Sequence, residues 1–402
     1  MLKKFDLEKT YQFLLITLAF LMPLTVSGAN SIIVIICFLW FFSGNYKAKF
    51  NYIISSKLMI ASLGFYCLHV VGMLWTEDLQ WGLHMLHKMW YFLLLLPILF
   101  NIVQREYIKY YLNAFLLAIA LTEIASYLVW FQLIPEFKNA TVDNPTPFMS
   151  HISYNPILAL AIYLTYHNIC FKTNLSVQKF FLYSFFAISM TFNMFITGGR
   201  AGQVMFFAML VILIFQFFNN DKIKSLFTIL VLIPLIFFSA YQSSPLFKER
   251  VDIAVSQAIN YENTEAIQVG SVGQRITFAV NSWEVIKENP IIGVGTGDFP
   301  SEYKKINDIK SIWMVPTTNP HNMYVLIAMQ FGLVGIVSML SIFYYQIKLS
   351  FNSKNRLMKD LGIALPLMFL VIMWSDSYIL GHFTTLVFVF FSSFLYKDFE
   401  KT

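Results

Sequence analysis

The chain has 402 residues, of which 57% are hydrophobic and 12% are charged. Soluble domains carry about 25% charged residues, so this composition excludes an ordinary soluble enzyme and indicates an integral membrane protein. The apolar runs are long and nearly free of charge, which predicts membrane helices and not the alternating strands of a β-barrel. The formal net charge is +6, but the position of the positive residues is more informative than their sum.

A membrane-spanning helix needs roughly 20 apolar residues, and by this rule the sequence predicts about twelve spans in an all-α fold. The first run has no convincing cleavage site, so we expect it to stay in the protein. The three cysteines lie inside apolar runs without a pairing pattern, so we expect neither a disulfide nor a zinc site. The predicted spans lie near residues 11–27, 30–43, 57–75, 81–100, 107–134, 152–171, 179–197, 200–218, 223–241, 321–347, 358–375 and 377–396.

The basic residues are distributed unequally across these spans. If the N-terminus is cytoplasmic, most of the 28 lysine and arginine residues fall on the cytoplasmic side. The short outward loops then hold only Lys88, Lys138 and Arg200. Because cytoplasmic loops carry an excess of Lys and Arg, this asymmetry predicts that both termini are cytoplasmic.

The topology divides the chain into three parts. Residues 1–241 hold nine spans, residues 242–320 form a large outward loop, and residues 321–402 hold the last three spans. Within the loop, the stretches 244–261 and 272–290 have the apolar spacing of amphipathic helices. They are followed by "IIGVGTGDFP", a turn rich in Gly and Pro.

Two arginines in this outward region are candidates for anion binding. Arg200 follows "TGG" at the start of a span, where two glycines allow a tight turn and a helix N-terminus offers free N–H groups. Arg275 lies at the N-terminal end of an apolar helix face that we expect to include Phe278 and Trp283. The alternative for Arg200 is a side chain that extends to the membrane–water interface without binding a ligand. The alternative for Arg275 is an ordinary surface arginine.

Several other polar residues near the outer surface are weaker candidates. Lys88 lies among aromatic residues, which suits either an interfacial belt or a phosphate pocket. Glu123 lies within a predicted span, where an acidic group is costly and therefore a functional hypothesis. Asp376 lies at the last hairpin, and His151 begins a span that borders the outer cavity.

The stretch "TTNPHNMYV" places a histidine at the border of the tenth predicted span. Asn319 suits a helix N-cap and Pro320 suits the first helical position, so His321 is expected in the first turn. The positive end of the helix there favours a neutral imidazole, which is the form that a general base needs. Asn322 follows directly and is a further candidate. The alternative is a plain helix start.

The sequence contains no Walker A motif, no HExxH motif and no Asp-x-Asp pair. Nucleotide hydrolysis and metal-dependent transfer from a nucleotide sugar are therefore disfavoured, and we expect no metal, no cofactor and no nucleic-acid partner. Because the candidate residues face outward, a sugar donor would have to be carried by the membrane.

These features together resemble the O-antigen ligase and polymerase superfamily of bacterial inner-membrane glycosyltransferases. The resemblance covers the whole topology and is sequence-specific over residues 195–205 and 273–336. It rests on "TGGRAG", on "NPIIGVGTGDF" after an Arg and a Trp, and on "PHNMYV" followed by "FGLVGI". Gly199 is a departure, because many members have Ser before the arginine.

The resemblance implies a GT-C-type fold and a metal-independent transfer from an undecaprenyl-diphosphate-linked glycan, with inversion at the anomeric carbon. Arg200 and Arg275 would hold the diphosphate, assisted by Lys88. His321 would activate a sugar hydroxyl of the acceptor, lipid A–core. The site would face the periplasm from the inner membrane, among membrane lipids.

The sequence therefore favours an O-antigen ligase. The alternatives within the superfamily are an O-antigen polymerase and a protein O-oligosaccharyltransferase. The modest size and the single large loop favour the ligase over the protein-modifying enzymes. A lipid-linked glycan flippase is the rival of another class, but it would need charges deep within several helices.

Overall fold

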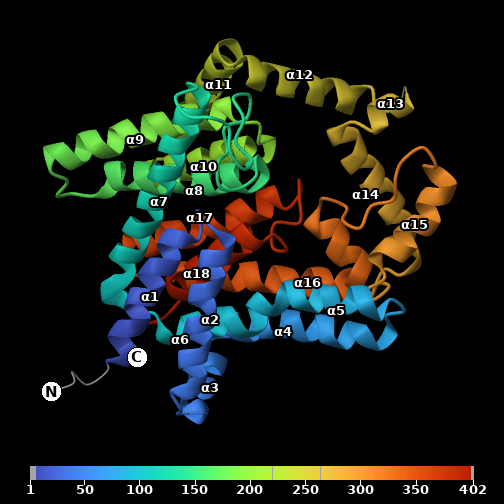
Figure 1. Ribbon diagram of the computed structural model, residues 1–402, viewed down its shortest axis with the longest axis horizontal. Helices are drawn as coiled ribbons and strands as arrows, with labels where there is room; N and C mark the ends of the chain where they lie inside the picture. Colours follow the sequence, from blue (N-terminus) through green and yellow to red (C-terminus); the bar gives the residue numbers. More distant parts are fainter. Residues whose placement is uncertain (1–5, 220, 263, 400–402) are drawn as a thin grey trace.

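The computed structural model describes residues 6–399 except 220 and 263, and all the named elements in this part of the chain are helices (Figure 1). The helices are α1 (Leu7–Leu21), α2 (Val26–Phe42), α3 (Tyr46–Ser55), α4 (Lys57–Gly72), α5 (Leu79–Trp90), α6 (Leu96–Ile102), α7 (Ile108–Trp130), α8 (His151–Phe171), α9 (Val177–Ile196), α10 (Arg200–Phe218), α11 (Lys222–Ser243), α12 (Pro245–Ile259), α13 (Glu265–Gln268), α14 (Ser271–Glu288), α15 (Phe299–Lys310), α16 (Met323–Phe351), α17 (Arg356–Ile372) and α18 (His382–Leu395). Three short turns join them, η1 (Met73–Trp75), the π-helical η2 (Tyr91–Leu95) and η3 (Arg105–Tyr107).

The apolar helices are those of a multi-pass membrane protein. Each of the twelve predicted spans contains a helix, but within the described residues only seven segments are long and apolar enough to cross a membrane by themselves. The number becomes eight if α2 and α3, which meet at a bend of 117°, form one span. Helix α3 was not predicted. The first and last predicted spans are longer than the helices observed there, because α1 has 15 residues and α18 has 14.

The last hairpin also differs from the prediction. We expected the final two spans to be separated only by residues 375–377, whereas the connection comprises residues 373–381. Its polar groups stabilise turns, because Asp376 accepts the Ser377 N–H at 2.7 Å and Leu380 N–H bonds to the Ser377 carbonyl at 2.9 Å. These backbone groups are therefore not available to α18, which begins only at His382.

Helices α8 and α10 run side by side in the same direction, with α9 as the return segment between them (Figure 1). Their N-terminal ends meet at Gly202, where an added Cβ would lie 2.2 Å from the Cβ of Asn155. Only a residue without a side chain fits this approach. The close packing places the start of α10 beside the start of α8, and this is the position of the candidate site.

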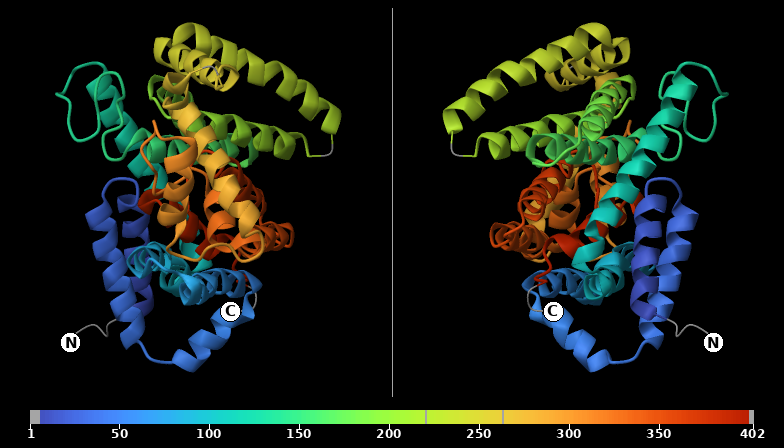
Figure 2. Two further views of the ribbon diagram at one scale, coloured as in Figure 1. Left: turned by 90° about the vertical axis from the view of Figure 1, so that its right-hand side faces the viewer. Right: turned by 90° about the vertical axis from the view of Figure 1, so that its left-hand side faces the viewer.

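The predicted outward loop folds into helices. The two amphipathic stretches form α12 and α14, as expected, and α13 and α15 are added between and after them. In Figure 1 α12 runs along the top of the molecule and α13, α14 and α15 lie at its right-hand side, and Figure 2 shows α14 and α15 in front of the remaining helices when that side faces the viewer. Helix α14 contacts α12, α15 and α16.

The glycine-rich turn before α15 joins this part to α16, which is broken at Gly332 with φ 57° and ψ −145°. Residues 290–295 supply the hydrogen bonds that the broken helix lacks. Val294 and Gly295 donate to carbonyls of α16 at 3.0 and 2.9 Å, and the carbonyl of Pro290 accepts from Leu333 at 2.8 Å. The turn and the kink are therefore one structural unit, because each satisfies the backbone groups of the other.

The same turn is also fixed to the start of α5. The carboxylate of Asp298, which is 3% exposed, accepts the backbone N–H of Glu77 at 2.9 Å and that of Asp78 at 2.8 Å. A buried carboxylate that accepts backbone N–H groups is well compensated. The sequence motif "GTGD" thus has a structural role that holds the outward helices on α16 and α5.

Candidate functional site

A cavity of about 650 Å³ lies where α8, α10, α12 and α14 meet the segment 371–378. Its lining contains three arginines, Arg200, Arg250 and Arg275. It contains no carboxylate among the described residues that line it. Such a cavity has a strongly positive potential and suits an anionic group.

Arg200 is the first residue of α10, as predicted. The N-cap residue Gly199 has no side chain to accept N–H groups of the first turn, and only that of Arg200 bonds to a backbone carbonyl outside the helix, that of Gly198 at 3.2 Å. The reason for the glycine differs from our expectation. Gly199 has a negative φ of −86°, and an added Cβ would lie 2.6 Å from the carbonyl oxygen of His151. Close packing on α8, and not an unusual turn, requires glycine here.

Three amide side chains hold the turn at residues 197–199 that presents Arg200. Asn144 accepts the N–H of Gly198 at 3.0 Å, Asn155 donates to the carbonyl of Gly199 at 3.2 Å, and Gln203 donates to that of Thr197 at 3.1 Å. Asn155 and Gln203 are buried. These bonds fix the backbone on both sides of the turn, so the position of the arginine is determined before any ligand binds.

Ser271, at the start of α14, connects two of the arginines. Nη2 of Arg200 donates to the Ser271 hydroxyl, and Nη1 of Arg275 donates to the Ser271 carbonyl at 3.0 Å. Arg250, from α12, lies close enough to Arg200 for the two charges to repel. Three elements thus bring like charges together, which costs free energy that a bound anion would offset.

Three hydrogen-bond donors on residues that line this cavity are buried and have no partner within hydrogen-bond distance. They are Nη1 of Arg200, Nε of Arg275 and the hydroxyl of Tyr378. Buried polar groups are nearly always hydrogen-bonded, so each such group needs an explanation. Here one explanation suffices for all three, because a ligand with several acceptor oxygens would satisfy them together.

His321 lies just before α16 and not in its first turn, which corrects the predicted helix start. Asn322 is the N-cap and accepts the N–H groups of Tyr324 and Val325 at 3.0 and 3.1 Å. Asn319 instead accepts the N–H of His321 at 3.0 Å, and His321 has a left-handed φ of 50°. The left-handed residue cannot continue a helix, so the helix begins after it.

The imidazole of His321 is oriented by a carboxylate. Nδ1 lies 3.1 Å from Oδ1 of Asp376, and the histidine side chain is 40% exposed whereas that of Asp376 is 13% exposed. A carboxylate only accepts, so Nδ1 carries the proton and Nε2 is left as the acceptor. This is the arrangement of a general base held in place by an acidic partner.

Two connections place His321 at the edge of the arginine cavity. Ser375 and Tyr378 line the cavity on either side of Asp376 in the chain. On the opposite side, Phe278 lies one helical turn after Arg275 and stacks on the imidazole, with ring centroids 6.2 Å apart. His321 and Asp376 do not line the cavity themselves, but these contacts place them next to residues that do or that lie one turn away.

The buried face of α14 is more polar than the sequence indicated. Trp283 is 57% exposed, whereas Asn281 is buried and donates to the Tyr303 hydroxyl at 3.3 Å and to Ser311 at 3.1 Å. These bonds rotate Asn281 inward and Trp283 outward. Burial raises the pKa of Tyr303 to about 12, so it stays a neutral hydrogen-bonding residue.

The remaining candidates are placed as follows. His151 lines the cavity and lies 2.9 Å from Asn144 through Nδ1. Asn322 is used in capping α16. Lys88, on α5, is not among the cavity residues. Glu123 lies on α7, where its carboxylate bonds to Ser189 in a separate apolar cavity of about 200 Å³. The structure does not bring Lys88 or Glu123 into the site.

The sequence reasoning missed Arg250 and Tyr378. A signal existed for Arg250, because it shares the apolar face of the predicted helix 244–261 with Phe247 and Val251. Tyr378 had none, since a tyrosine in an apolar hairpin is ordinary. Tyr378 becomes a lining residue only because the segment 371–378 folds back beside α10.

Residues 185–340 match the family model described as O-Antigen ligase. The matched region begins in α9, contains Arg200, Arg250, Arg275 and His321, and ends within α16. This match supports the assignment of the chain to the O-antigen ligase and polymerase superfamily. The comparison with curated proteins gives no match.

Members of this superfamily are membrane glycosyltransferase-like enzymes, and the family implies lipid-linked glycan substrates. The matched region contains the three arginines of the cavity, and residues 151–152 and 371–378 outside it complete the lining. The O-antigen ligase resemblance drawn from three short motifs is thus confirmed at the level of the superfamily.

Proposed function

We propose that the protein is an O-antigen ligase that transfers O-polysaccharide from undecaprenyl diphosphate to lipid A–core. The observation that carries the proposal is the set of unpartnered donors of Arg200, Arg275 and Tyr378 in one positive cavity, beside the His321–Asp376 pair. A diphosphate offers several acceptor oxygens and negative charge, which is what these donors require.

In the proposed reaction, the acceptor hydroxyl attacks the anomeric carbon of the donor glycan. The bond between that carbon and the diphosphate oxygen breaks, and undecaprenyl diphosphate leaves with the electron pair. Nε2 of His321 takes the hydroxyl proton, and Asp376 stabilises the imidazolium that forms. Direct displacement inverts the anomeric centre.

The arginines stabilise the charge that develops on the leaving group. Their positions are fixed by Ser271 and by the amide side chains around residues 197–199, so little reorganisation is needed during the reaction. We place Arg250 with them as a third cation, and the uncapped start of α10 adds a positive helix end beside the same anion. No metal is required by this scheme.

We further propose the inner membrane as the location, with both termini cytoplasmic and the site in the periplasm. In this arrangement residues 1–241 and 321–402 form the membrane part, and residues 242–320 form the periplasmic part. A GT-C-type architecture is consistent with a helical membrane body that carries its site at one end.

The test is a transfer assay with purified protein in detergent, lipid-linked glycan, lipid A–core and a chelator. We expect glycan on lipid A–core at the same rate with and without chelator. Arg200→Ala and Arg275→Ala should each lose donor use by about 100-fold or more while still inserting into membranes. Unchanged donor binding in both variants would contradict the phosphate-binding role, and inhibition by chelator would contradict a metal-free mechanism.

The same assay separates the alternatives. Lengthening of the repeat-unit chain identifies a polymerase, and glycan on a pilin or another protein identifies a protein O-oligosaccharyltransferase. Movement of lipid-linked glycan between leaflets without any transfer identifies a flippase. The His321–Asp376 pair favours an enzyme over a flippase, because transport requires no base.

A further inference from the structure

A second cavity lies at the other end of α16. Its volume is about 490 Å³, and it is bounded by the starts of α7 and α17 and by the ends of α16 and α18. The candidate site borders the first residues of α16. The two cavities have no lining residue in common, and the length of α16 lies between them. The second cavity is therefore independent of the proposed transfer site.

The floor of this cavity is apolar and its rim is basic. Ile108, Leu112 and Leu395 are at most 8% exposed and form part of the floor. Among the described residues that line it, four are cationic and one is a carboxylate, namely Arg105, Lys109, Lys354 and Lys397 against Asp398. Arg105 and Lys109 are exposed, so they stand at the opening.

Lys397 differs from the other cations because it is partly buried within the cavity wall. Its ammonium group donates to the carbonyl oxygens of Val103 at 2.9 Å and Asn101 at 3.3 Å. Both acceptors are neutral, and burial lowers the pKa of Lys397 to about 8. The ammonium also lies over the rings of Tyr52 and Phe100, at 5.3 and 5.8 Å, and a nearby anion would further offset the burial of its charge.

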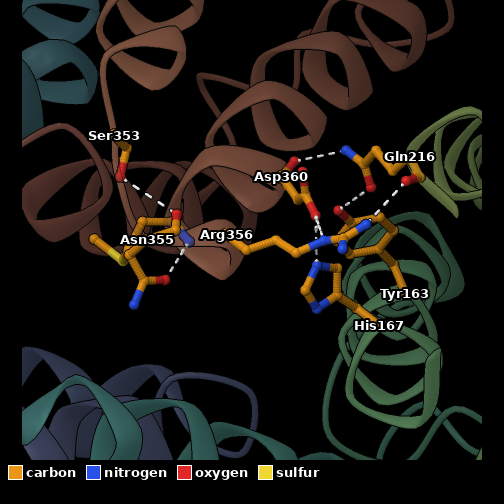
Figure 3. A network of polar contacts seen from close by, with 8 residues as sticks. Tyr163, His167, Gln216, Ser353, Asn355, Arg356 and Asp360 are labelled. Carbon is orange, nitrogen blue, oxygen red and sulfur yellow. Dashed lines mark hydrogen bonds and ion pairs between the residues drawn. The ribbon is translucent and has the colours of Figure 1, made fainter. Parts of the chain in front are cut away.

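The loop that forms one side of the opening is fixed by a polar network (Figure 3). Asn355 caps α17 by accepting the Met358 N–H at 3.1 Å. In the next turn, Oδ2 of Asp360 lies 3.3 Å from Nε of Arg356 and 2.9 Å from Nε2 of His167. The guanidinium of Arg356 is thereby held over the ring of Phe171, at 3.9 Å, and its charge is used within the fold.

We propose that this cavity binds the phosphate headgroup of an anionic glycerophospholipid. Arg105, Lys109 and Lys397 contact the phosphate, and the apolar floor covers the glycerol and the first part of the acyl chains. Basic pockets between membrane helices are suited to such headgroups, and apolar walls distinguish a lipid from a free anion. The binding site lies on the side of the molecule where the charge distribution places the cytoplasm.

The test is retention of lipid by purified protein, measured by native mass spectrometry after exchange into mixed micelles. Wild-type protein should retain phosphatidylglycerol in preference to phosphatidylcholine. The double variant Arg105→Gln/Lys109→Gln should weaken this retention by about 10- to 30-fold, because each basic residue near the surface contributes on the order of a tenfold factor or less. Lys179→Gln, an exposed lysine on α9 outside the cavity, is the control and should retain lipid as wild type does.

The outcomes decide the proposal in the following way. Equal retention of the two lipids by wild type, or full retention by the double variant, would overturn it. Displacement of phosphatidylglycerol by millimolar inorganic phosphate would show a site for a free anion and would also overturn it. Gel filtration and helical circular dichroism establish that each variant is folded. Transfer activity is measured in parallel, and loss of transfer with intact lipid retention would concern only the proposed function.

Discussion

His321 is held by its surroundings in a backbone conformation that few residue types adopt. Its φ of 50° is left-handed, and Asn is one of the residues that tolerate this region well. His321→Asn therefore keeps the local backbone but removes the imidazole. We expect folded protein with transfer reduced by about 100-fold or more, measured with lipid-linked glycan at saturation. Transfer at the wild-type rate would show that His321 is not the base.

Tyr378 gives a second prediction at the residue scale, since its buried hydroxyl has no partner. Tyr378→Phe removes an unsatisfied polar group, so the melting temperature should stay the same or rise. Binding of the donor diphosphate should weaken by about tenfold, because a hydrogen bond to a charged group is lost. Both are measured on one preparation, by thermal unfolding and by donor titration.

Tyr324→Phe is the matched control. The Tyr324 hydroxyl donates to the carbonyl of Leu370 at 2.6 Å and does not line the cavity. Its loss should lower the melting temperature and leave donor affinity unchanged. If the two variants behave alike in donor binding, the hydroxyl of Tyr378 is not a ligand of the diphosphate.

At the scale of elements, the break in α16 connects the outward helices to the membrane helices. Gly332 has φ 57° and ψ −145°, and an added Cβ would lie 2.5 Å from the carbonyl carbon of Ile291. Gly332→Ala should therefore destabilise the protein by about 1–3 kcal/mol from backbone strain, with the clash in addition. Thermal unfolding in detergent measures the loss.

Gly64→Ala provides the comparison for this prediction. Gly64 lies in α4 with nothing within 4 Å of an added Cβ. Alanine there reduces the freedom of the unfolded chain without a clash, so stability should be unchanged or slightly higher. An equal effect of the two substitutions would mean that the turn at residues 290–295 does not constrain the kink.

At the scale of the whole molecule, the two cavities lie at opposite ends of α16, which predicts opposite sides of the membrane. Asp308→Cys on α15 and Thr173→Cys between α8 and α9 test this prediction in a variant without Cys37, Cys67 and Cys170. A maleimide that cannot cross the inner membrane should label the first variant in intact cells. It should label the second only after permeabilisation, and labelling of both would contradict the proposed topology.

The sequence by itself determined the class of the protein and most of its helices. Long apolar runs must be helical in a bilayer, because no water is present to satisfy the backbone. Short motifs also made Arg200, Arg275 and His321 candidates, and their functional roles stay a prediction. The sequence did not determine the first residue of α16. Asn319 and Asn322 both suit an N-cap, and only the left-handed His321 decides between them.

Tertiary structure decided which candidates share one site. Lys88 and Arg200 looked alike as outward basic residues, but only Arg200 lies in the cavity. Arg250 and Tyr378 join it because α12 packs against α14 and α17 packs against α10, and such long-range packing has no local signature. The unpartnered donors are likewise visible only in the folded chain. Whether a polar group lacks a hydrogen-bond partner depends on every neighbour in space, and the sequence orders only the neighbours along the chain.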